Sequence, residues 1–75
     1  MSPILPRITA KKIIIVLEKV GFVLTRQSGS HKIYKNIDGK RATVPFHSSK
    51  ILHPKILKSI LCDAELDIED LMKLL

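Results

Sequence analysis

Apolar residues recur every three or four positions in three segments of the chain, which is the spacing of an amphipathic helix. The first segment follows Thr9, a residue type that favours helix starts, and ends at Gly21, which favours helix ends. It predicts a helix over residues 10–20. Ile15 falls opposite the apolar stripe, among lysines, where it is either a tolerated surface residue or a contact for a partner. The stripe itself comprises Ala10, Ile13, Ile14, Leu17 and Val20.

Two further helices are predicted near the C-terminal end. Pro54 suits the first position of one helix, because its fixed φ and missing N–H fit there. Asp67 is expected to cap the other helix, with Asp70 at the capping-box position. The stripes expected to face the core are Ile56, Leu57, Ile60, Leu61 and Ala64 in the first and Ile68, Leu71, Met72 and Leu75 in the second. The opposite side of the first is expected to carry Lys55, Lys58 and Cys62.

Three short runs rich in β-branched and aromatic residues lie between the helices, at 22–26, 31–35 and 41–44. Turns at Ser28-Gly29 and Asp38-Gly39 separate them and predict an antiparallel meander. Pro45 ends the third strand because it has no amide to donate. The alternation within 31–35 leaves open which side faces inward, so Tyr34 either fills the core or stacks on a nucleobase.

This order of elements predicts an α+β fold: a single domain over residues 1–75, in which the helices cover one face of a three-stranded antiparallel sheet. No apolar run approaches the roughly 18 residues of a membrane span. The first seven residues lack the features of a signal peptide, and the single cysteine cannot form an internal disulfide. We therefore expect a cytoplasmic protein that does not bind membranes.

Charge is unevenly distributed along the chain. The net charge is +6, yet residues 1–58 contain only Glu18 and Asp38 as carboxylates against all but one of the 13 lysines and arginines. The strong positive charge of residues 1–58 favours a polyanionic partner. A nucleic acid is the partner that we expect most, followed by an acidic protein surface. Three histidines and one cysteine without close pairs do not form a zinc site, and no glycine-rich phosphate loop is present, so no metal or cofactor is expected.

Candidate chemistry lies in the stretch Gly29-Ser30-His31-Lys32. Glycine and serine favour a tight turn that delivers His31 to the start of a strand. A neutral imidazole can take a proton from a ribose 2′-hydroxyl, while the cation of Lys32 steadies the phosphodiester. Without further context, a plain structural or exposed histidine is the alternative.

Several motifs together resemble the HicA family of bacterial and archaeal toxins, which are small mRNA interferases with a double-stranded-RNA-binding-like fold. The resemblance covers nearly the whole chain. It is carried by Gly21-Phe22, by Arg26-Gln27-Ser28-Gly29-Ser30-His31 leading to Tyr34, by Thr43-Val44-Pro45-Phe46-His47, and by the spacing from Leu57 to Ile60. The chain departs from the family where Lys55-Ile56 replaces a common Gly-Thr pair.

The resemblance implies that His31 is the catalytic histidine of a metal-independent endoribonuclease, whose products are a 2′,3′-cyclic phosphate and a 5′-hydroxyl. His47 matches the family's Pro-x-His position. It could be a second proton donor, a substrate contact or a residue that fixes the loop by a hydrogen bond, and of these we favour a structural role or substrate positioning. His53 is expected to be a helix cap. The candidate RNA-binding residues are Arg26, Ser30, Lys32, Lys35, Arg41 and His47, with a solvated charged face as the alternative for the cations.

The sequence thus predicts the toxin half of a toxin–antitoxin pair, which cleaves single-stranded mRNA and binds a HicB-like antitoxin that covers His31 and the basic surface. One alternative is a non-catalytic RNA-binding module, because double-stranded-RNA-binding domains share this order of elements. Another alternative is an adaptor that binds only proteins, but this alternative does not explain the strong positive charge of residues 1–58.

Overall fold

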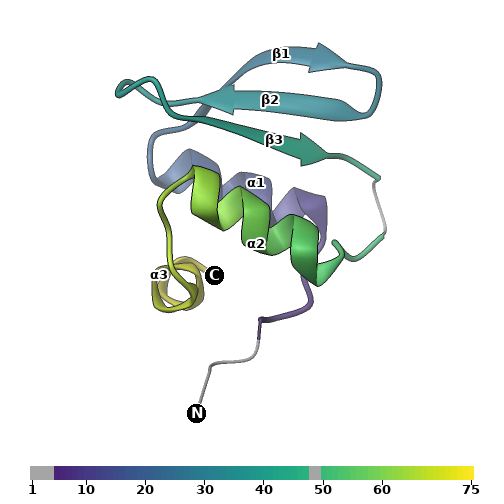
Figure 1. Ribbon diagram of the computed structural model, residues 1–75, viewed down its shortest axis with the longest axis vertical. Coiled ribbons are helices and arrows are strands. Elements are labelled where there is room, and N and C mark those ends of the chain that lie inside the picture. Colours follow the sequence, from purple (N-terminus) through teal and green to yellow (C-terminus); the bar gives the residue numbers. More distant parts are fainter. Residues whose placement is uncertain (1–4, 48–49) are drawn as a thin grey trace.

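The computed structural model describes residues 5–47 and 50–75, so six residues of the single domain predicted over 1–75 lie outside the described ranges. It contains three helices and three strands (Figure 1). In chain order these are α1 Ala10–Lys19, β1 Val23–Ser28, β2 His31–Lys35, β3 Arg41–Pro45, α2 Pro54–Asp63 and α3 Ile68–Leu74. This is the predicted α+β architecture, with the double-stranded-RNA-binding-like order of elements.

The sheet is antiparallel, in the order β1-β2-β3. β1 runs two residues further than predicted, because Ser28 pairs with His31 across a two-residue turn. Gly29 occupies the first turn position with a φ of 57°, which a residue with a side chain rarely adopts. A bulge between Leu24 and Arg26 interrupts the pairing of β1 with β2.

α1 and α2 cover one face of the sheet, chiefly under β3, and α3 lies on the side of the helices away from the sheet (Figure 1). β1 is the strand farthest from the helices, and all six of its residues are exposed. The sequence placed Phe22 in the first strand, but it is a buried residue that precedes β1. Val23 and Leu24 are 61% and 48% exposed, because the helices do not extend beneath this edge of the sheet.

The core lies between the sheet and the helices. Tyr34 is buried there, which settles the alternation in β2: Lys32 and Tyr34 face the helices, while His31 and Lys35 face away. Ile56, predicted to be buried in α2, is exposed instead. The largest fully buried side chains are Ile13, Val16, Leu17, Val44, Leu57, Ile60 and Leu71.

The predicted helix caps are present. The Thr9 side chain accepts a hydrogen bond from the Lys12 amide at 3.4 Å. The His53 Nδ1 atom accepts from the Lys55 amide at 3.1 Å, which confirms its role as a cap of α2. Asp67 and Asp70 form a reciprocal capping box at α3, and each side chain accepts from the other residue's amide, at 2.7 and 3.1 Å.

α3 buries a narrower face than its apolar stripe predicts. Leu71 is fully buried, but Met72 is 55% exposed and Leu75 is also exposed, contrary to prediction. Among the labelled helices and strands, only α1 makes substantial contact with α3. Only one side of α3 therefore packs against other residues. Its C-terminal end is held by Lys19 of α1, whose Nζ donates to the Leu74 carbonyl at 2.8 Å.

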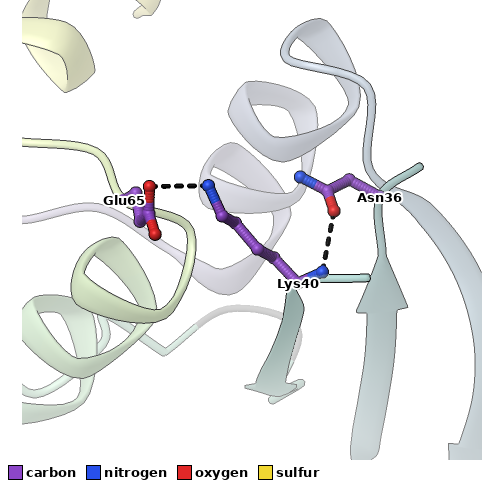
Figure 2. A network of polar contacts seen from close by, with 3 residues as sticks. All are labelled: Asn36, Lys40 and Glu65. Atoms are coloured by element: carbon purple, nitrogen blue, oxygen red, sulfur yellow. Dashed lines mark hydrogen bonds and ion pairs between the residues drawn. The ribbon is translucent and has the colours of Figure 1, made fainter. Parts of the chain in front are cut away.

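The junction between α2 and α3 is tied to the β2–β3 turn (Figure 2). Lys40 Nζ lies 2.6 Å from Glu65 Oε2, while the Lys40 amide donates to Asn36 Oδ1 at 2.8 Å. Glu65 has a φ of 55°, and its amide donates to the Cys62 carbonyl, as in a Schellman helix end. Glycine is the residue usually found at this position.

The effect of replacing Glu65 is therefore expected to depend on the substitute. Glu65→Gln removes the exposed ion pair and should lower the free energy of unfolding by no more than about 1 kcal/mol. Glu65→Gly also removes the ion pair but relieves the left-handed strain, so it should be more stable than Glu65→Gln by about 1 kcal/mol. Urea unfolding of the two variants checks this difference, and a glycine variant no more stable than the glutamine variant would contradict it.

Candidate active site

His31 is the first residue of β2, and its side chain is exposed on the face of the sheet that points away from the helices. We call this surface the open face. The register places Ser28 of β1 and Pro45 of β3 on either side of His31. The open face comprises Val23, Arg26, Ser28, His31, Ile33, Lys35, Arg41, Thr43 and Pro45.

Three of the predicted RNA-binding cations share the open face with His31. Arg26 lies opposite Ile33, two residues along β2 from His31, and Lys35 lies directly opposite Arg41. All three cations are exposed. Within residues 5–47 and 50–75 the one salt bridge joins Lys40 to Glu65, so no described carboxylate neutralises them. The open face therefore carries uncompensated positive charge as well as an exposed imidazole, with Arg26 nearer to His31 in the register and with Lys35 and Arg41 at the other end of β2.

Lys32 lies on the opposite face of the sheet from His31. Consecutive residues of a strand point to opposite sides, so adjacency in sequence does not bring these two side chains together. The Lys32 ammonium instead lies 4.1 Å from the centroid of the Phe46 ring, in a cation–π contact. The expectation that Lys32 steadies the phosphate at His31 is thus not supported by this geometry, although Lys32 remains at the same end of the sheet.

Ser30 and His47 flank this end of the sheet. The Ser30 carbonyl accepts a hydrogen bond of 2.6 Å from the Phe46 amide, which extends the β2–β3 pairing one residue beyond His31 and Pro45. This bond fixes the turn that presents His31. His47 is exposed two residues after Pro45, so the structure brings it near the His31 end of the sheet.

Tyr34 does not take part in the open face. Burial raises the pKa of its hydroxyl, and the negative charge of Glu18 raises it further, so the phenol stays protonated at neutral pH. Its ring is buried and is not available to stack on a nucleobase. Tyr34 is a core residue.

A hollow of about 450 Å³ opens on the helix side of β2, close to Lys32. It was not predicted from the sequence, although four of its residues share one face of α1 at the spacing i, i+3, i+4 and i+7. We call it the α1 hollow, and it is lined by Lys11, Ile14, Ile15, Glu18, Lys32 and Phe46. A larger hollow of about 630 Å³ near α2 and α3 contains none of the predicted site residues.

The described part of the chain contains neither a group of side chains that could hold a metal ion nor a helix that could span a membrane. Across residues 5–47 and 50–75, no three His, Cys, Asp or Glu side chains gather into a group that could hold a metal ion. None of the helices in those ranges has the length and apolar character of a membrane span. Cys62 is exposed and unpaired with another cysteine.

Comparison with known families supports the motif-based resemblance. A family model described as the HicA toxin of bacterial toxin–antitoxin systems matches residues 10–66. This span contains His31, all three open-face cations and both walls of the α1 hollow. No curated protein matches the chain. Because the family model covers well over half of the chain, the protein belongs to the HicA family of toxins from toxin–antitoxin systems.

Proposed function

We propose that this toxin is an endoribonuclease that cleaves single-stranded mRNA without a metal ion, with His31 as the general base. The observation that supports this best is the exposed imidazole of His31 on the same open face as Arg26, Lys35 and Arg41, three cations that no carboxylate in the described residues pairs with. A phosphodiester backbone is the ligand that such a surface attracts.

In the proposed reaction, the neutral imidazole of His31 takes the proton of a ribose 2′-hydroxyl. The 2′-oxygen then forms a bond to phosphorus, while the bond from phosphorus to the 5′-oxygen breaks and that oxygen takes up a proton. The products are a 2′,3′-cyclic phosphate and a 5′-hydroxyl. The open-face cations hold the phosphates and stabilise the charge that develops on the phosphoryl oxygens.

The remaining predicted residues have supporting roles in this proposal. Ser30 holds the turn that presents His31, through its backbone bond to Phe46. Lys32 contacts RNA from the helix side of the sheet, and His47 positions the substrate at the same end. A HicB-like antitoxin would cover the open face in the cytoplasm, and residues 1–75 act as one domain.

A non-catalytic RNA-binding module is the second candidate function. The fold itself favours it, as do the exposed Lys50, Lys55 and Lys58 around the start of α2, because double-stranded-RNA-binding domains contact phosphates from such positions. This candidate predicts RNA binding without cleavage.

Incubation of the purified protein with a long RNA in excess chelator tests the proposal. Fragments that end in a 2′,3′-cyclic phosphate and a 5′-hydroxyl are expected. Intact RNA that is nevertheless bound would favour the binding module, and cleavage that requires an added divalent cation would overturn the metal-independent mechanism.

Binding to single-stranded RNA should depend strongly on salt. Each phosphate contact contributes about −0.7 to the slope of log K against log salt concentration, so we expect a slope of roughly −2 to −4. Lys35→Ala and Arg41→Ala should each make the slope shallower by about 0.7. Lys73→Ala, which removes an exposed cation from α3, serves as the control and should leave the slope unchanged. A slope near zero in the unmodified protein would argue against RNA binding at the open face.

A further inference from the structure

We propose that the α1 hollow is a nucleobase subsite that prefers guanine or cytosine in a nucleotide next to the scissile one. The inference rests on the proposed function, because it assigns a base-recognition role to residues beside the candidate active site. It gives a purpose to Ile15, Glu18 and Phe46, none of which the cleavage step uses.

The hollow has two walls of different origin. One wall is a single stripe of α1, in which Ile14 and Ile15 lie between Lys11 and Glu18. The other is the Lys32–Phe46 pair, whose ammonium and ring are held together at 4.1 Å. Ile15 is 45% exposed on a basic helix. The flat apolar face of a base would cover such a residue.

The hollow lies at the same end of the sheet as His31, but on the helix side rather than on the open face. Lys32 directly follows His31, and Phe46 directly follows Pro45, the residue paired with His31. The bond from the Phe46 amide to the Ser30 carbonyl holds this end of the sheet together. A strand of RNA with one phosphate at His31 can therefore pass the sheet end and place a neighbouring base against α1.

Glu18 gives the hollow its selectivity. It is one of two carboxylates in residues 1–58, and no cation in the described residues forms a salt bridge with it. An unpaired carboxylate repels phosphates, so it weakens binding to a nucleic acid unless it accepts hydrogen bonds from a base. Carboxylates accept from the amino groups of bases, and lysines donate to their carbonyl oxygens.

Only some bases offer both groups. Guanine and cytosine each carry an amino group for Glu18 and a carbonyl oxygen for Lys11 or Lys32. Adenine has an amino group but offers a lysine only ring nitrogens as acceptors, and uracil has carbonyl oxygens but offers a carboxylate only its single ring N–H as a donor. The charges around the hollow therefore favour guanine and cytosine over adenine and uracil.

Binding of short oligonucleotides tests the subsite without cleavage. We would measure fluorescence anisotropy of the His31→Ala protein with four five-nucleotide RNAs, identical except for adenine, guanine, cytosine or uracil at the centre. Guanine and cytosine are expected to bind about tenfold more tightly than adenine and uracil. Glu18→Gln in the same protein should reduce that preference below about twofold, whereas Asp63→Asn, an exposed carboxylate of α2 outside the hollow, should retain it.

Cleavage by the unmodified protein separates the two proposals. Sequencing of the new 5′ ends should show guanine or cytosine enriched beside the cut, with the enrichment lost in Glu18→Gln. Cleavage without base preference, or with a preference that survives Glu18→Gln, would overturn the subsite and leave the nuclease intact. Glu18-dependent base preference in binding, without any cleavage, would overturn the nuclease and leave the subsite. Equal binding of all four RNAs in every variant would leave the hollow to a protein partner and overturn the inference.

Discussion

His31→Ala is expected to abolish RNA cleavage and growth arrest while the fold remains intact. The side chain is exposed at the start of β2 and contributes nothing to the core, so its loss should not lower the free energy of unfolding by more than about 0.5 kcal/mol. Removal of a general base lowers the rate by about 10²- to 10⁴-fold. The measurement is the rate of appearance of cyclic-phosphate ends, with a circular dichroism spectrum of each protein.

The matched control for this prediction is His53→Asn. His53 is also an exposed histidine, but it caps α2, and asparagine can accept the same hydrogen bond from the Lys55 amide. This variant should keep its cleavage rate. Full activity in His31→Ala, with an unchanged spectrum, would remove the basis for the general-base assignment.

Local signals in the sequence predicted the elements well. Thr9, His53 and Asp67 mark helix starts because their side chains accept hydrogen bonds from the first free amides, and the structure contains all three bonds. Gly29 marks the β1–β2 turn because its φ is positive. These features depend on residues close together in the chain, which is why the order of elements could be read without any tertiary contact.

Which side chains share a surface could not be predicted in the same way. The alternation in β2 defines two sets of residues, but only the packing of the helices decides that Tyr34 and Lys32 are the inward set. Sequence adjacency suggested that Lys32 assists His31, and strand geometry separates them. The grouping of Arg26 with His31 depends on the register of β1 against β2, which neither strand reveals alone.

Helical periodicity likewise identifies an apolar face without showing what covers it. Met72 belongs to the same stripe as Leu71 but is exposed, because α3 meets α1 along one side only. The α1 hollow could not be predicted either, because helical spacing defines only one of its two walls. Its residues on α1 have helical spacing, yet the second wall comes from Lys32 and Phe46, which lie far along the chain.

Leu71→Ala is expected to have the largest effect on stability among the α3 residues. Leu71 is fully buried, and its truncation should lower the free energy of unfolding by about 2 to 5 kcal/mol through lost apolar contact and a residual cavity. A domain of 75 residues has a total stability of only about 4 to 11 kcal/mol. The Leu71→Ala substitution should therefore remove roughly half of the total stability.

Met72→Ala is the matched control, because Met72 is the next residue in the same helix and is more than half exposed. Its effect should stay within about 0.5 kcal/mol. Urea unfolding measures both variants, and equal effects would show that α3 is not part of the cooperative core. Because Leu71 contacts neither the open face nor the α1 hollow, the cleavage rate per folded molecule should be unchanged in Leu71→Ala. A lower rate per folded molecule would mean that α3 also positions α1 for RNA binding, through the contact between these helices and the bond from Lys19 to Leu74.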